Sequence, residues 1–389
     1  FVTLPYILKT IGTEHYGAYS YIYAIAQYVI MFSTYGFNFS ATKQISQSRT
    51  DSKAVSNIFN SVIAGKSLIA TVITVLLFLF NRWIFKDQIG TLMFVFSLGM
   101  VLGDIFTPVW LFQGLERMKY MTIVNASSKI LFTILIFVFI HETNDYYLLI
   151  LLNSCGYLLS GILSIMLVYK QFNIRLHRVK WVDVKQQLKE GKEVFGSTFG
   201  MNLYRNANVI ILKQFVSDEV VGIYSAAEKV VKGFQSIISP AAQALFPHLS
   251  LRFKNKSLHE NVALLKKIAL PFSVVVTIIT AFVYIFAPQI TDILCGEGYT
   301  DSIPLVRIMT LVILFGEINY LVGIVGLINM NGQRYFFRSV MIVGVFSVLF
   351  MLSLLPHYGV NIAAWAMSLA EILLFLLCIL SLYRINKRV

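Results

Sequence analysis

Three basic residues lie deep inside long apolar runs of the sequence. Arg205 follows the start of its run at Val194 by 11 residues, which is about 16 Å along a helix that rises 1.5 Å per residue. By the same measure Lys229 and Lys232 lie about 12 and 16 Å beyond Val221. A charge near mid-bilayer costs about 2.5 to 3.5 kcal/mol on insertion scales, so we expect all three to face a polar interior rather than lipid. Together they would suit a pyrophosphate or an acidic sugar, because a guanidinium binds phosphate through two hydrogen bonds.

Polar neighbours accompany these cations along the predicted helices. Asn202 and Asn206 lie within one turn of Arg205 and extend a stripe of hydrogen-bond donors. Lys232 follows Glu228 by four residues, so an alternative is that these two side chains form an ion pair that eases insertion. We include Asn202 with the candidate substrate-binding residues.

Two lysines, Lys66 and Lys129, are the corresponding substrate-binding candidates in the first half of the chain. Both lie some way in from the cytoplasmic ends of their runs. The alternative for both is that the ammonium group extends to the inner headgroups on its four-carbon stem. Lys213 and Arg307 lie close to the outer ends of their runs, where the same explanation is the simpler one.

Three acidic residues also lie within apolar runs: Asp104, Glu317 and Glu371. Burial and a nearby cation shift the proton affinity of a carboxylate in opposite directions, so such a group can exchange a proton or a sodium ion as a cavity opens to either side. We therefore predict that they serve ion coupling and that no other cofactor or metal is bound. The alternative is that each forms an ion pair or hydrogen bond that holds helices together.

The composition identifies the elements that must carry these side chains. Of 389 residues 57% are hydrophobic and only 13% charged, with a mean hydropathy of +0.72, which is typical of a polytopic membrane protein. We predict an all-α fold of about 12 transmembrane helices, the first of them truncated. They lie near residues 1–11, 17–38, 58–80, 90–112, 122–140, 147–168, 194–216, 221–245, 268–287, 303–328, 337–355 and 359–383.

The net charge of +13 is unevenly distributed over the connections between these spans. One set of connections holds 22 of the 32 Lys and Arg residues, and the opposite set holds three. This bias follows the positive-inside rule and predicts a cytoplasmic C-terminus. It also removes the need for a nucleic-acid partner, which a basic chain would otherwise suggest.

Two pairs of similar segments indicate an internal duplication. YGAYSYIYAI at Tyr16 returns as VGIYSAAEKV at Val221, and the Gly-Asp-Ile that contains Asp104 returns as the Gly-Glu-Ile that contains Glu317. The offsets are 205 and 213 residues, close to half the chain. An even number of spans per copy gives parallel repeats. We predict a six-helix lobe over 1–169, a basic cytoplasmic linker over 170–192 that is partly an amphipathic helix on the anionic inner surface, and a second six-helix lobe over 193–389.

Motifs for catalysis are absent from the sequence. It contains no phosphate-binding GxxxxGK[ST], no HExxH and no nucleophile elbow, so we expect a protein that is not an enzyme. A membrane glycosyltransferase or polymerase would need a large outer loop, whereas the longest outward connection is about residues 288–302. A channel is disfavoured because the charges are scattered over two repeats rather than ringed in one pore. Cys155, Cys295 and Cys378 match neither a metal nor a redox spacing.

The sequence resembles one family of membrane proteins along its whole length. It is similar to the Wzx-type flippases, the polysaccharide transporter branch of the multidrug/oligosaccharidyl-lipid/polysaccharide exporter superfamily. The segments that carry the resemblance are LPYILKTIGTEHYGAYSYIYAI, YGFNFSATKQIS, FTPVWLFQGLERM, DEVVGIYSAAEKV and ALFPHLS. The resemblance implies a MATE-like pair of lobes that alternate between inward and outward states.

The resemblance also implies a substrate and partners. The substrate would be an undecaprenyl-pyrophosphate-linked glycan, such as an O-antigen or capsule repeat unit, that crosses the bacterial inner membrane in contact with membrane lipids. A polysaccharide polymerase and a chain-length regulator would be its protein partners. The alternative is a multidrug or other amphiphile exporter of the same superfamily, whose cationic substrates would require acidic cavity walls.

Overall fold

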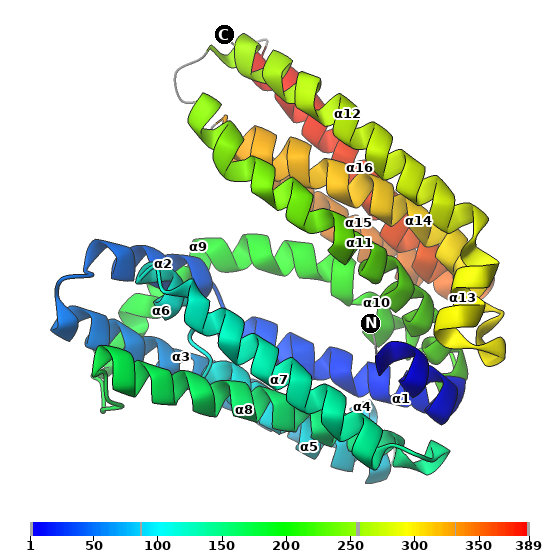
Figure 1. Cartoon of the computed structure of the whole chain (residues 1–389), viewed down its shortest axis with the longest axis horizontal. Helices are drawn as coiled ribbons and strands as arrows, with labels where there is room; N and C mark the ends of the chain where they lie inside the picture. Colours follow the sequence, from blue (N-terminus) through cyan, green and yellow to red (C-terminus); the bar gives the residue numbers. More distant parts are fainter. Residues whose placement is uncertain (1–2, 86–87, 254–256, 331, 387–389) are drawn as a thin grey trace. The chain divides into compact units, whose positions relative to one another are not determined.

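The computed structural model describes residues 3–85, 88–253, 257–330 and 332–386, and within these ranges the chain forms helices and no strand (Figure 1). It divides into two compact units. The first unit comprises Ala18–Phe199. The second comprises the residues up to Gly17 together with those from Gly200 onward.

Most helices of the first unit occur in the order of the spans predicted from the sequence. Its helices are α1 (Thr3–Thr34, shared with the second unit), α2 (Phe37–Gln47), α3 (Ser52–Leu79), α4 (Asn81–Ile84), α5 (Gln88–Ile105), α6 (Val109–Gly114), α7 (Met118–Phe139), η1 (Thr143–Asp145) and α8 (Tyr146–Phe172). Helix α3 begins at an Asp51 cap, whose carboxylate accepts hydrogen bonds from the backbone N–H groups of Lys53 and Ala54 at 3.0 Å.

The second unit holds the remaining helices. They are α9 (Trp181–Asn206, which begins in the first unit), α10 (Asn208–Leu212), α11 (Asp218–Phe253), α12 (Leu258–Ile285), α13 (Ala287–Cys295), η2 (Glu297–Tyr299), α14 (Ser302–Asn319), the π-helix η3 (Tyr320–Ile328), α15 (Gln333–Tyr358) and α16 (Asn361–Asn386). The segment expected as the longest outward connection is therefore itself largely helical.

The two units repeat one packing pattern. In the first, α8 packs against α5 and α7; in the second, α16 packs against α14 and α15. In each predicted six-span lobe, therefore, the helix of the last span contacts the helices of the two spans before it. The helix that carries the Gly-acid-Ile motif is also interrupted shortly after it: α5 ends at Ile105 before Pro108, and α14 passes into η3 after Asn319.

The expected linker and the boundary between the units differ in position. Residues 181–192 of the predicted linker are helical, as expected for its amphipathic part, but they belong to α9, which continues without interruption to Asn206. Contacts divide the chain within this helix, after Phe199, and group Thr3–Gly17 with the second unit.

Eight helical segments in the described ranges are long and apolar enough to cross a membrane, against twelve predicted spans. The long helices that do not meet this description are α1, α9 and α11, with 32, 26 and 36 residues, and α1 is interrupted by a kink at Gly12. They have the length to cross a bilayer. Their sequences are more polar, with many tyrosines in α1 and the cations Arg205, Lys229 and Lys232 in α9 and α11.

The repeated glycines of the duplicated segments contact one another. A Cβ atom on Gly17 would lie 1.8 Å from the Asp218 carbonyl oxygen, and one on Gly222 would lie 1.8 Å from the Thr13 carbonyl oxygen. Thr13 and Asp218 are separated by the same 205 residues as Gly17 and Gly222, so the contact is reciprocal. Helix backbones approach this closely only where both lack a side chain. This close contact gives a physical reason why YGAYS and VGIYS share a glycine at the same position.

We predict that Gly222→Ala destabilises the protein although alanine favours a helix. The added methyl group overlaps backbone that cannot move aside alone, which costs roughly 1–3 kcal/mol. Thermal unfolding of the purified protein in detergent measures the effect. Gly298→Ala is the control, because a Cβ atom there meets no atom within 4 Å. Equal unfolding temperatures for the two variants would contradict the close contact.

Candidate functional site

An ion pair joins two helices in the interior of the second unit. The Nη2 atom of Arg205 on α9 lies 3.0 Å from Oε1 of Glu371 on α16. The amide of Asn319, at the end of α14, donates to Oε2 of Glu371 at 2.7 Å and to its backbone oxygen at 2.8 Å. One carboxylate therefore connects three helices, and both its oxygens are hydrogen-bonded.

The two members of this pair differ in exposure. The side chain of Glu371 is 1% exposed, whereas that of Arg205 is 43% exposed. The guanidinium lies 5.4 Å from the centre of the Tyr204 ring, which is itself buried and supports one face of the cation. Because the guanidinium has five N–H donors, contact with Glu371 leaves others available to a ligand. Arg205 is thus an accessible cation and Glu371 a hidden counter-ion.

Lys232 extends this positive region from α11. Its Nζ atom lies 2.9 Å from Oε1 of Glu228, the predicted i, i+4 pair, and 3.3 Å from Oδ1 of Asn206. Asn206 in turn donates to Oδ1 of Asn202 at 2.6 Å. The structure thus links Lys232 and Asn202 through Asn206, the residue that follows Arg205 in sequence. Lys229 lies one turn from Lys232 on α11, with an exposed side chain.

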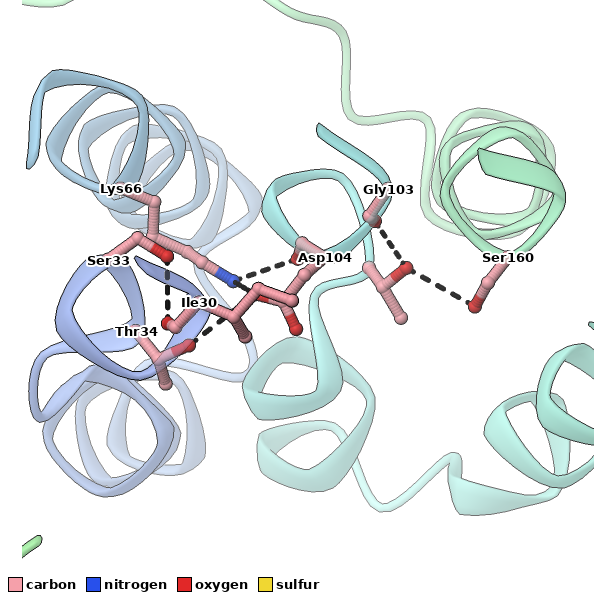
Figure 2. Close-up of polar contacts among 8 residues, drawn as sticks. Ile30, Ser33, Thr34, Lys66, Gly103, Asp104 and Ser160 are labelled. Carbon is pink, nitrogen blue, oxygen red and sulfur yellow. Dashed lines mark hydrogen bonds and ion pairs between the residues drawn. The ribbon is translucent and has the colours of Figure 1, made fainter. Parts of the chain in front are cut away.

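Lys66 in the first unit is held by a carboxylate rather than extended to the headgroups (Figure 2). Its Nζ atom donates to Oδ2 of Asp104 at 2.7 Å and to the Asp104 backbone oxygen at 2.8 Å. Thr34 contributes a hydroxyl at 3.4 Å from the same Oδ2. The lysine side chain is 3% exposed and the aspartate 25%. The accessible member is the acid, the reverse of the Arg205 pair.

Lys129 lies on the surface of α7. It is exposed, and so are Thr122 and Asn125, which precede it at helical spacing on the same face. An exposed apolar stripe that includes Ile123 and Ile130 runs beside this polar one. The two stripes fit a helix that meets lipid along one side and a polar environment along the other.

The remaining predicted carboxylate, Glu317, is 4% exposed and accepts a hydrogen bond from the Ser239 hydroxyl at 2.6 Å. Asp104 occupies the matching sequence position but pairs with a cation, so the two copies of the motif have different partners. Sequence reasoning missed Ser239 and Asn319. The signal for Asn319 was an amide in an apolar run, two residues after Glu317.

Neither a metal nor a redox centre emerges from the described residues. They contain no group of three or more His, Cys, Asp or Glu side chains that could hold a metal ion. All three cysteines are free thiols. The chemistry of the site is therefore that of fixed cations, carboxylates and amides within an apolar helical unit, which can bind anions and exchange protons.

Solved structures define the fold class. A multidrug resistance MATE family transporter of the MOP superfamily, in an inward-facing conformation, matches with a TM-score of 0.74 and 14% identity, over 99% of this chain and 98% of that one. The lipid II flippase MurJ, in an inward closed conformation, matches with a TM-score of 0.76 and 12% identity, over 99% and 87%. The predicted all-α, MATE-like class is confirmed, and the chain is a multi-pass membrane protein of this fold.

Sequence comparison then identifies the family. The family described as "Polysaccharide biosynthesis protein" matches residues 1–253, and the chain belongs to it. Its relatives include a protein of Escherichia coli (strain K12) named "Putative O-antigen transporter", 27% identical over 91% of this chain and 85% of that protein. One of Shigella dysenteriae with the same name is 26% identical over 100% and 95%. These comparisons confirm the expected family and the expectation of a transport protein rather than an enzyme.

We predict that Arg205→Met alone destabilises the protein by about 3 kcal/mol, because it leaves the Glu371 carboxylate buried without its cation. Adding Glu371→Leu should restore most of that loss, since an apolar pair needs no compensation. Unfolding of the single and double variants in detergent measures the coupling. If the stability losses of the two single variants add up to that of the double variant, the ion pair contributes no coupling energy.

Proposed function

We propose that the chain is a flippase that moves polyprenyl-pyrophosphate-linked oligosaccharide repeat units across the bacterial inner membrane by alternating access. The names of the two relatives and the family support a polysaccharide substrate. The observation that carries the proposal is the accessible Arg205 guanidinium, with a second cation, Lys232, bonded to the adjacent residue Asn206. A pyrophosphate offers both cations an anionic, bidentate partner.

In the proposed mechanism the pyrophosphate competes with Glu371 for Arg205. When the guanidinium turns to phosphate, the carboxylate stays buried with Asn319 as its remaining hydrogen-bonded partner. A carboxylate that has lost its cation can take up a proton in the cation's place, so we expect substrate binding and proton uptake to be coupled, and the coupling to be reciprocal. A sodium ion could replace the proton. Glu317 and Asp104 are the further candidates for ion coupling.

The orientation and partners follow from the charge distribution and the proposed substrate. The excess of Lys and Arg on one set of connections, which includes the 170–192 linker, supports a cytoplasmic C-terminus and contact with anionic lipid. The polymerase and the chain-length regulator that handle the exported glycan are the expected protein partners.

A multidrug exporter is disfavoured by the second unit. Cationic substrates would need accessible carboxylates, whereas Glu371 and Glu317 are buried and already hydrogen-bonded. The accessible charge of the Arg205–Glu371 pair is positive.

The variant Arg205→Gln with Glu371→Gln tests substrate binding, because it removes the cation without leaving a buried charge. We expect surface glycan to fall to background in a strain whose own copy is deleted, while the membrane level of the protein is unchanged. Antibody or lectin staining of cells measures the glycan. Arg307→Gln, which removes another exposed arginine, is the matched control and should keep normal glycan. Normal glycan in the double variant would reject the site.

Glu371→Gln alone tests the coupling. In the wild type, binding of polyprenyl diphosphate takes up a proton, so its affinity should fall as pH rises from about 6 to 8, by up to tenfold per pH unit. The variant has no carboxylate to protonate and should show only the titration of the diphosphate itself. Binding to the purified protein in detergent measures both curves. Identical pH dependence in the two proteins would exclude Glu371 as the coupled group.

A further inference from the structure

A pocket of about 740 Å³ lies in the second unit, away from Arg205 and Lys232 in sequence. One wall is the segment of α1 around Lys9 and Gly12, and the other is formed by the end of α13 and by η2, from Asp292 to Tyr299. Its volume is within the range of small-molecule sites. In the orientation proposed above, these segments lie at the outer surface, where a translocated glycan would emerge.

Three glycines, Gly12, Gly296 and Gly298, line this pocket. Gly12 and Gly296 have φ values of 75° and 92°, a backbone conformation that side-chain-bearing residues rarely adopt. A Cβ atom at Gly296 would lie 3.1 Å from Cγ of Lys9, so the lysine stem packs directly on the glycine backbone. Gly298 has no such constraint, and a Cβ atom there would meet no atom within 4 Å. A methyl group at 298 would therefore fit without displacing neighbours.

Charged side chains of both signs line the pocket without neutralising each other. Lys9, Asp292 and Glu297 are exposed, and their side chains make no hydrogen bond or ion pair with the residues described in the structure. The hydroxyl of Tyr299, a residue only 2% exposed, also has no partner among these residues. A buried hydroxyl left unsatisfied beside a cavity is typical of a site that water or a ligand completes.

The chemistry of these groups selects a class of ligand. Two carboxylates accept hydrogen bonds from hydroxyls and one ammonium donates to them, which matches the mixed donors and acceptors of a sugar ring. With two negative charges and one positive, the wall disfavours an anion. Calcium would need six to eight oxygen ligands, and these two carboxylates supply too few. Burial raises the pKa of the Cys295 thiol to about 12, so no thiolate is present to bind metal or react.

We propose that this pocket binds a neutral pyranose ring of the glycan on the outer side of the membrane, with Asp292 and Glu297 accepting its hydroxyl hydrogens and Lys9 donating to its oxygens. The assignment rests on the proposed function, since that function supplies a glycan at this surface. The pocket then serves as a receiving site that selects sugars by their hydroxyl pattern, separate from the cations proposed to bind pyrophosphate.

Saturation-transfer NMR on the full chain in detergent tests the pocket with soluble methyl glycosides of neutral hexoses and N-acetylhexosamines, which lack lipid and phosphate. We expect at least one glycoside to bind, and Asp292→Asn with Glu297→Gln to weaken that binding by about tenfold or more. Gly298→Trp should abolish it by filling the space. Asp301→Asn, a carboxylate change in the same connection outside the pocket, is the matched control and should bind normally.

Three results would overturn the assignment: no glycoside binding by the wild type, binding unaffected by the pocket variants, or Ca²⁺ binding at these carboxylates without glycoside binding. The variant Arg205→Gln with Glu371→Gln separates this site from the proposed function. It should lose surface glycan yet keep glycoside binding. A wild-type protein that transports lipid-linked glycan but binds no glycoside would reject the pocket assignment alone. A wild-type protein that binds glycoside but transports no lipid-linked glycan would reject the transport proposal alone.

Discussion

The structure depends on one constraint: a charge taken into an apolar interior must be compensated by a partner that is held in place. Among the described residues, each unit contains an ion pair with one buried member between helices distant in sequence, Lys66 with Asp104 and Arg205 with Glu371. The exposure is opposite in the two pairs. The first hides its cation and the second hides its carboxylate, so an anion can reach a cation only in the second of these pairs.

The internal duplication predicted from the sequence accounts for the shared packing pattern, and the structure shows where the two predicted copies differ. Gly17 and Gly222 occupy matching positions and form one reciprocal contact, so both had to stay small. The Gly-acid-Ile motif likewise ends a regular helix in both units. Its carboxylate, however, binds Lys66 in one copy and the Ser239 hydroxyl in the other. Backbone packing thus constrained the duplicated positions more strongly than polar chemistry did.

The sequence alone predicted the helical class and the positions of most long helices, because these depend on composition and on the pattern of apolar residues. It also predicted the Glu228–Lys232 pair, since both residues lie on one helix. It could not pair Arg205 with Glu371, which is 166 residues away, or connect Asn319 to Glu371. Such contacts depend on how each helix is rotated and packed against its neighbours, and a single sequence carries no record of that rotation.

A transport site must bind its substrate and also release it, and the Arg205–Glu371 pair suits both requirements in the proposed mechanism. A cation without a counter-ion would hold a pyrophosphate more tightly, because the attraction between opposite charges is stronger beside an apolar interior than in bulk water. A hidden carboxylate lowers that affinity, since binding must first separate it from Arg205. Return of the carboxylate to its ionised form then favours the original pair and expels the phosphate. Release is therefore built into the same three helices that provide binding.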